Sequence, residues 1–251
     1  MIEVHNLTFG YSSTEDGQIL KGVDFAAKTG KLTALIGTNG AGKSTLLKTI
    51  MGILKGKGEI SVNGKPVSQY STKDFSSTVS YLSQDNDCKV NLSVFEVVML
   101  GRMGSMSFRV SDEDIAATQE VLERLNLQRF ASRSIMELSG GQRQLVFMAQ
   151  ALVKEPKILI LDEPTSALDL HKQFDLLTLL KNLTQENDFT TLVTLHHLDL
   201  AAMFADEIIV LKEGTVYAQG APKDIFTEAM MEDVYRVKTK IYMDDNGLPH
   251  V

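Results

Sequence analysis

The sequence predicts an α/β fold in which a core with a mainly parallel sheet carries an N-terminal antiparallel β lobe and an inserted α-helical lobe. Apolar and polar residues alternate over the first thirty positions, which is typical of half-buried antiparallel strands. Helix-start signals gather between residues 85 and 137, and apolar runs on both sides of them indicate buried parallel strands. We expect a single domain over residues 1–251, with the β lobe and first part of the core in 1–84, the helical insert in 85–137 and the rest of the core in 138–251.

Composition narrows the classes of function. With 251 residues, the chain is long enough to bury about three quarters of its unfolded surface. Its net charge of −7 argues against binding the phosphate backbone of nucleic acid as the main task, so we expect no nucleic-acid partner. Because Cys88 is the single cysteine, no intrachain disulfide can form, and we interpret Cys88 as a structural residue without a functional role. No apolar run reaches the roughly 18 residues of a membrane span, and the N-terminus does not resemble a signal peptide, which predicts a soluble chain.

The N-terminal elements follow from local patterns. Residues 2–9 and 22–30 alternate as antiparallel strands do. The run "KLTALIG", residues 31–37, predicts a buried strand that leads through a glycine-rich turn into a helix ending near Gly52. The segment "GEISVNGKPV" predicts a hairpin with its turn at Asn63–Gly64.

The helical insert is predicted from capping-box spacing. Ser93 and Glu96 precede one apolar run, and Ser111 and Asp114 open the next helical pattern in the same way.

Beyond the insert the strand pattern resumes. Residues 157–163, 190–197 and 206–220 contain continuous apolar stretches suited to parallel strands, and the last includes a hairpin at Glu213–Gly214.

The stretch "GTNGAGKST", Gly37 to Thr45, matches the phosphate-loop pattern between a predicted strand and a predicted helix. Its glycines let successive N–H groups point inward, where they and the helix N-terminus stabilise a polyphosphate. Lys43 is expected to reach the β and γ phosphates, and Ser44 to place its hydroxyl on Mg²⁺. The expected nucleotide contacts are Gly37, Thr38, Asn39, Gly40, Ala41, Gly42, Lys43, Ser44 and Thr45. The pattern predicts a P-loop NTPase core; the alternative is a turn that merely opens a helix.

An Asp–Glu pair ends the predicted strand "KILILDE". Asp162 would lie beside the phosphates and hold Mg²⁺ through water, while Glu163 would orient or deprotonate the attacking water. A solvated acidic pair after a strand is the alternative.

The stretch "LSGGQ", residues 138–142, is a second candidate anion site. Ser139 can cap the following helix with Gln142 in capping-box spacing, and Gly140 and Gly141 keep side chains away from the helix N-terminus. For these residues alone, an ordinary helix start explains the pattern equally well.

Taken in order, these motifs resemble the nucleotide-binding subunits of ATP-binding cassette (ABC) transporters over nearly the whole chain. The stretch "LSGGQ" looks like that family's signature, twenty residues before the Asp–Glu pair. The resemblance implies that Tyr11 stacks on adenine and that Gln84 joins Mg²⁺ to the membrane-subunit interface. It also implies that the loop carrying Asp169 reaches across to a partner copy. Taken singly, Tyr11 would more often be an ordinary strand residue and Gln84 a solvated loop side chain.

The resemblance also implies a switch histidine that contacts the γ-phosphate. We assign it to His196, because residues 198–211 then align with the family's next helix and strand. His197 occupies a position where the family usually has aspartate. Another departure is Ser83, where a proline often precedes the glutamine. Taken alone, His196 would more often be an ordinary histidine at a strand end.

In the resembled family two copies pack head to tail, so that each ATP lies between the phosphate loop of one and the signature of the other. The implied activity is ATP hydrolysis coupled to transmembrane transport, with ATP and Mg²⁺ as cofactors and a second copy of the chain as partner. ATP would join the subunits by charge-assisted hydrogen bonds, and hydrolysis would weaken the joint.

Residues 94–115 resemble the branch that imports iron chelates and cobalamin, with a valine-rich helix, Gly–Arg and a Ser–x–x–Asp helix start. The sequence has "MGSM" where the branch often has a proline and a histidine. The branch implies separate membrane-spanning permease subunits, an extracytoplasmic binding protein, and a peripheral location on the cytoplasmic side of the cell membrane. Met103, Met106 and Phe108 could either pack inside the α lobe or form a docking surface.

Other cassette classes remain as alternatives. An importer of another solute or an exporter would share these motifs. A non-transport cassette is less favoured, because fewer than a hundred residues separate Ser44 from Ser139, whereas a DNA-repair cassette would carry a long coiled coil there. A translation-factor cassette would usually be duplicated within one chain.

Overall fold

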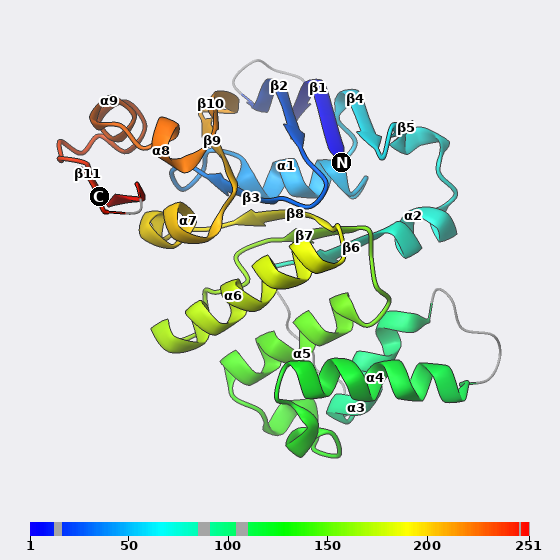
Figure 1. Ribbon diagram of the computed structural model, residues 1–251. Coiled ribbons are helices and arrows are strands. Elements are labelled where there is room, and N and C mark those ends of the chain that lie inside the picture. Colours follow the sequence, from blue (N-terminus) through cyan, green and yellow to red (C-terminus); the bar gives the residue numbers. More distant parts are fainter. Residues whose placement is uncertain (13–16, 85–90, 104–109, 246, 251) are drawn as a thin grey trace. The chain divides into compact units, whose positions relative to one another are not determined.

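The computed structural model describes residues 1–12, 17–84, 91–103, 110–245 and 247–250 (Figure 1). Cys88, Met106 and Phe108 lie outside these ranges. The chain divides into two compact units, the first formed by residues 1–70 and 174–251 and the second by residues 71–173. The second unit therefore holds the predicted helical insert together with the residues that flank it on both sides.

The first unit contains the predicted antiparallel sheet. It is formed by β1 (Ile2–Gly10), β2 (Gln18–Ala27), β4 (Lys57–Val62) and β5 (Lys65–Pro66), in the order β2-β1-β4-β5. Ile2 pairs with Ala27 on one side and with Val62 on the other, and all three are buried. The Asn63–Gly64 turn is also confirmed, since both residues have positive φ, as a tight hairpin turn requires.

A mainly parallel sheet forms the core of the first unit. The strands β3 (Leu32–Ile36), β8 (Thr190–Thr194) and β9 (Glu207–Lys212) are parallel, and β10 (Thr215–Gly220) pairs antiparallel with β9. Within this unit the order is β10-β9-β3-β8. Every residue of β3 and β8 is buried, as the continuous apolar runs predicted.

Shorter elements complete the first unit. They are α1 (Lys43–Ile50), η2 (Val67–Gln69), α7 (Leu198–Phe204), α8 (Pro222–Ile225), α9 (Glu228–Met230), the π-helix η6 (Met231–Tyr235), β11 (Tyr242–Met243) and β12 (Pro249–His250). The division between the units falls at Phe174, inside α6 (Leu170–Glu186). The elements after β10 have no strong periodicity, and the sequence patterns did not predict them.

The second unit is built mainly from helices. It contains α2 (Thr72–Thr78), β6 (Val79–Leu82), α3 (Val94–Met99), η3 (Leu100–Arg102), α4 (Asp112–Arg124), η4 (Gln128–Phe130), η5 (Ile135–Glu137), α5 (Gly140–Leu152) and β7 (Ile158–Leu161). Helices α3, α4 and α5 pack on one another (Figure 1), and β6 pairs parallel with β7. The predictions missed α2 and β6, which are short and carry little apolar patterning.

Both capping boxes predicted in the insert are present. Ser93 caps α3 with Glu96, and Ser111 caps α4 with Asp114, each serine accepting from the backbone N–H three residues on. In return, the carboxylates of Glu96 and Asp114 accept hydrogen bonds from the backbone N–H groups of Ser93 and Ser111. Each box therefore satisfies two N–H groups that a helix start otherwise leaves unpaired.

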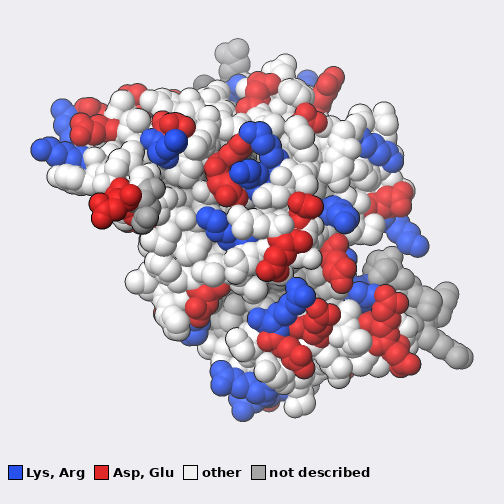
Figure 2. All heavy atoms as spheres, viewed as in Figure 1, with Lys and Arg blue, Asp and Glu red and all other residues white. Residues whose placement is uncertain are grey.

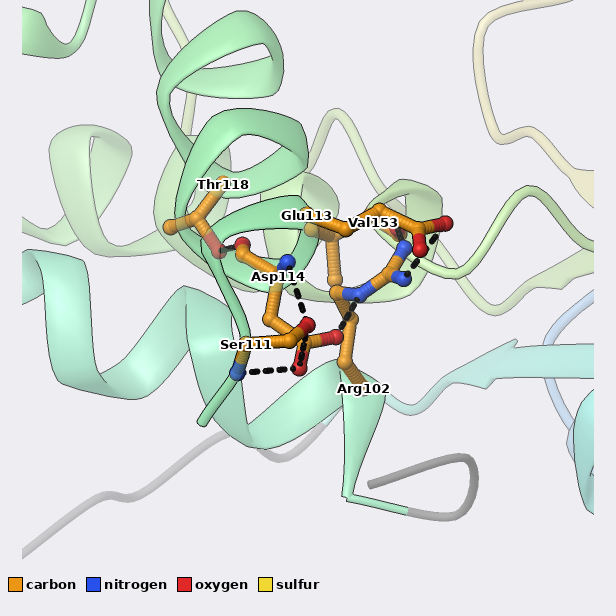
Figure 3. Close-up of polar contacts among 6 residues, drawn as sticks. All are labelled: Arg102, Ser111, Glu113, Asp114, Thr118 and Val153. Carbon is orange, nitrogen blue, oxygen red and sulfur yellow. Dashed lines mark hydrogen bonds and ion pairs between the residues drawn. The ribbon is translucent and has the colours of Figure 1, made fainter. Parts of the chain in front are cut away.

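Arg102 joins three of these elements (Figure 3). Its Nε donates to Asp114 Oδ1 at 2.6 Å and its Nη1 to the carbonyl oxygen of Val153 at 3.2 Å, just after α5 ends. The side chains of Arg102 and Asp114 are 15% and 8% exposed. The Arg102 guanidinium and the Ser111 hydroxyl and backbone lower the pKa of Asp114 to about 2. A largely buried, charge-assisted bond thus holds the end of η3 to the start of α4 and the end of α5.

We expect Asp114→Asn to lower the thermal unfolding midpoint at pH 7, because an uncompensated guanidinium then remains largely buried. Because the pKa of Asp114 in the folded state lies below its ordinary value of 3.8, its ionised carboxylate stabilises the fold at pH values above 3.8. This stabilisation is lost as the pH falls toward about 2. The difference between wild type and Asp114→Asn should therefore shrink between pH 4 and pH 2, followed by circular dichroism. Glu113→Gln is the control, since Glu113 is 86% exposed and lies 3.8 Å from Arg102. If the difference in unfolding midpoint between wild type and Asp114→Asn stayed constant over this pH range, the stabilising role of the Arg102–Asp114 ion pair would be refuted.

Charged side chains of both signs are interspersed on the face drawn in Figure 2. In the described part of the chain, no helix combines the length and the apolar character that a membrane span needs.

Candidate functional site

The phosphate loop lies between β3 and α1, as predicted. Gly37, Gly40 and Gly42 have φ of 148°, 80° and 103°, a region that favours glycine. A Cβ on Gly37 would lie 2.2 Å from the carbonyl oxygen of Leu211. Larger residues are therefore excluded at Gly37 by contact as well as by conformation.

The N-terminus of α1 is open to an anion. Its N-cap, Gly42, supplies no side-chain hydrogen bond, and no acidic residue lies in the first turn. Lys43 is buried, and its Nζ donates to the carbonyl oxygens of Gly37 at 2.8 Å and Thr38 at 3.1 Å. The ammonium group thus lies across the loop beside the positive end of the helix dipole, an arrangement suited to phosphate.

The histidines follow the strand next to β3. Leu35 of β3 pairs with Thr194 of β8, and because the two strands are parallel, the loops after them leave the same edge of the sheet. This brings His196 to the edge that carries the phosphate loop. His196 and His197 are both exposed, and His197 is the N-cap residue of α7.

Tyr11 lies just beyond β1, in the same unit as the phosphate loop. It is 72% exposed, and its ring packs edge-to-face on Phe9 with the centroids 5.0 Å apart. An exposed ring held by a neighbour is available for stacking on a base.

The second unit brings Gln84, Asp162 and Glu163 together at the carboxyl ends of β6 and β7. Leu82 pairs with Leu161, and the N–H of Asp162 donates to the carbonyl oxygen of Leu82 at 2.8 Å. Asp162 is 1% exposed. Gln84 Nε2 donates to Glu163 Oε2 at 2.6 Å. Glu163 has φ of 52°, a left-handed conformation that is uncommon for a residue with a Cβ.

The signature serine caps α5 as predicted. Ser139 accepts from the N–H of Gln142 at 3.3 Å, and the Gln142 side chain accepts from the N–H of Ser139 at 2.9 Å. A Cβ on Gly141 would lie 3.1 Å from the carbonyl oxygen of Ala167, whereas one on Gly140 would meet nothing within 4 Å. Gly141 therefore permits close packing inside the unit, while Gly140 leaves open space at the helix N-terminus.

Asp169 lies where the loop after Glu163 enters α6. It accepts from the backbone N–H and the ammonium group of Lys172, which lower its pKa. The buried Gln173 donates to the carbonyl oxygens of Thr165 at 3.2 Å and Leu168 at 3.0 Å, which fixes this loop.

Two residues that contact loops of the candidate site were not predicted from the sequence. One is Gln173. The other is Tyr235, whose pKa is raised to about 12 by burial, although a hydrogen bond from the backbone of Gly37 opposes the rise. Tyr235 belongs to no recognisable motif. Gln173 ends the stretch "PTSALDLHKQ", residues 164–173, which resembles the branch that imports iron chelates and cobalamin, but its contacts with Thr165 and Leu168 depend on how the loop folds.

The predicted Mg²⁺ ligands have side chains of the kind that a hard divalent cation binds. Ser44, Gln84 and Asp162 offer a hydroxyl, an amide oxygen and a carboxylate, which are ligands that Mg²⁺ accepts. Within the described ranges, His, Cys, Asp and Glu form no cluster of three that could hold a metal ion by itself.

Comparison with known proteins agrees with these features. The family described as ABC transporter matches residues 20–166. The Iron(3+)-hydroxamate import ATP-binding protein FhuC of Bacillus subtilis is 37% identical over 97% of this chain and 90% of its own. The ferric enterobactin transport ATP-binding protein FepC of Escherichia coli is 34% identical over 95% of this chain and 88% of its own.

Among solved structures, the ATP-binding cassette MJ0796, described as dimeric and bound to ADP and Pi in a post-hydrolysis state, is similar with a TM-score of 0.79. It is 30% identical over 88% of this chain and 98% of its own. The chain therefore belongs to the ABC transporter family, as an ATP-binding subunit that hydrolyses ATP.

Proposed function

We propose that the chain powers an importer of an iron chelate or a cobalamin-like solute by ATP-driven head-to-tail dimerisation. Its similarity over nearly the whole length to FhuC and FepC, which are named for hydroxamate and enterobactin complexes of iron, is the observation that carries this proposal. In this role residues 1–251 act as a single ATPase domain.

The nucleotide would be held mainly by the first unit. Tyr11 would stack on adenine, and Lys43 would exchange its carbonyl partners for the β and γ phosphates. The phosphates would also accept hydrogen bonds from the backbone N–H groups of the loop and of the first turn of α1. The proposed loop contacts are Gly37, Thr38, Asn39, Gly40, Ala41, Gly42, Lys43, Ser44 and Thr45.

Hydrolysis would depend on the predicted Mg²⁺ ligands, on Glu163 and on His196. Ser44, Gln84 and Asp162 would hold Mg²⁺, which supplies positive charge to the phosphate oxygens when bound. Glu163 would take the proton of the attacking water as general base. His196 would donate a hydrogen bond to the γ-phosphate, where negative charge develops during hydrolysis.

The second half of each site would come from another copy. Gly140 leaves open space at the N-terminus of α5, where the γ-phosphate of a partner's ATP could approach the backbone N–H groups. The residues proposed to face the partner's nucleotide are Ser139, Gly140, Gly141, Gln142 and Asp169. The dimeric state of the MJ0796 cassette supports this arrangement.

The proposal implies further partners. Permease subunits that span the membrane would bind the chain on the cytoplasmic face, and a binding protein outside the membrane would deliver the solute. The experiment is to purify the tagged chain from membranes of its native organism and identify what accompanies it. We expect a membrane-spanning permease, and uptake of a labelled iron chelate or cobalamin that stops in cells carrying Lys43→Ala. Unchanged uptake of both solutes in those cells would contradict the substrate assignment.

The choice of histidine gives a separate prediction. We expect His196→Ala to slow ATP hydrolysis by about 10²-fold, the scale of losing a transition-state hydrogen bond, while ADP affinity stays unchanged. The matched control is His197→Ala, with turnover and ADP binding measured for both variants. Loss of hydrolysis in His197→Ala with normal turnover in His196→Ala would assign the role to the other histidine.

A further inference from the structure

The hydrogen bond between Gln84 and Glu163 is built into the backbone of the second unit. Leu82 and Leu161 are partners in the parallel pair β6–β7, and each of the two side chains lies two residues beyond its leucine. The backbone bond from Asp162 to Leu82 continues the strand register to this point. The two side chains therefore meet because the strands are paired, and their bond of 2.6 Å needs no ligand to form.

The chemistry of the two groups fixes the direction of this bond. An ionised carboxylate only accepts hydrogen bonds, so the Gln84 amide must present its nitrogen to Glu163. The amide oxygen of Gln84 is then directed to other partners. That oxygen is the atom a hard cation would use, since a neutral amide binds Mg²⁺ through oxygen.

The backbone at Glu163 also restricts the side chain. Its φ of 52° is unfavourable for a residue with a Cβ and persists only where the surroundings enforce it. The N–H and hydroxyl of Ser166 donate to the Glu163 carbonyl oxygen at 3.3 and 3.1 Å, which secures the turn. The carboxylate itself is held at its far end by Gln84.

We propose that Gln84 is a positioning residue for Glu163, holding the carboxylate in one rotamer through Nε2 while Oε1 stays available to the cation. The inference rests on the proposed role of Glu163 as general base. It gives Gln84 an effect on hydrolysis that is separate from metal binding. A base that can rotate away from the attacking water loses rate even when nucleotide and metal are bound normally.

A double-mutant cycle measures this coupling directly. At saturating Mg²⁺ and ATP, Gln84→Ala should lower the rate of single-turnover hydrolysis by about 10- to 100-fold, the scale of a misplaced catalytic group. In a Glu163→Ala background at saturating Mg²⁺, the same substitution should have a much smaller effect, because the group that Gln84 positions is already absent. An equal loss in both backgrounds would show that Gln84 acts independently of Glu163, and would overturn the proposal.

Gln84→Glu separates the two ends of the amide. It keeps an oxygen that can bind a cation, but at pH 8 it cannot donate to Glu163 and repels it. Positioning predicts a loss comparable to that of Gln84→Ala, with the Mg²⁺ concentration for half-maximal rate within about 3-fold of wild type. Near-normal turnover in Gln84→Glu would mean that only the oxygen matters, and would also refute the proposal.

A readout without nucleotide or metal tests the bond itself. In protein labelled with ¹⁵N and kept in EDTA, the Gln84 side-chain amide should exchange with solvent more slowly than that of Gln128, which is exposed. Glu163→Ala should accelerate solvent exchange of the Gln84 side-chain amide and leave the exchange of the Gln128 amide unchanged. Fast exchange at Gln84 in an active wild-type protein would defeat this inference alone, whereas a wild-type protein without ATPase activity would defeat the proposed function.

Discussion

Glu163→Gln is expected to lower ATP turnover by about 10²-fold or more, the scale of removing a general base. The substitution keeps the shape of the side chain, and its amide oxygen can still accept from Gln84. The carboxylate that would take a proton from water is lost, while the groups that hold the phosphates remain. The variant should therefore bind ATP normally and accumulate as an ATP-dependent dimer, because the step that separates the copies is blocked.

Steady-state phosphate release and size-exclusion chromatography with and without ATP measure both effects. Glu123→Gln is a suitable control, since that side chain is exposed on α4. Wild-type turnover in Glu163→Gln would remove Glu163 from the proposed mechanism. Loss of ATP binding together with turnover would instead indicate that Glu163 supports the fold of the site.

Most of the fold could be predicted because its signals are local. The Ser93, Ser111 and Ser139 caps depend on side chains three residues apart, and each was found where the spacing placed it. The bend at Gly37 was predicted for the same reason, although the nearby Leu211 carbonyl that makes glycine necessary comes from a distant strand.

Contacts between distant segments were not predictable from one sequence. The bond from Gln84 to Glu163 requires β6 to lie beside β7, and β6 was itself missed because its four residues carry no distinctive pattern. Tyr235 contacts the phosphate loop from a π-helix near the C-terminus, a placement that depends on tertiary packing. Sequence spacing alone could not reveal either contact.

Distributing two defects between copies should distinguish a shared site from a private one. Lys43→Ala removes the ammonium group from the phosphate loop, and Ser139→Arg places a bulky cation at the open N-terminus of α5. If each ATP lies between two copies, Lys43→Ala in one chain and Ser139→Arg in the other place both defects in one site and leave the second intact. If both substitutions are in one chain and its partner is wild type, each site has one defect.

The most direct measurement of head-to-tail sharing is the ATPase activity of these two pairs, purified with different tags and compared alongside nucleotide-induced dimerisation. We expect the pair with separated defects to retain activity, up to about half that of wild type if the two sites fire independently, and the pair with both defects in one chain to be inactive. Greater activity in the second pair than in the first would mean that the signature serves the nucleotide of its own chain, which would contradict the shared site.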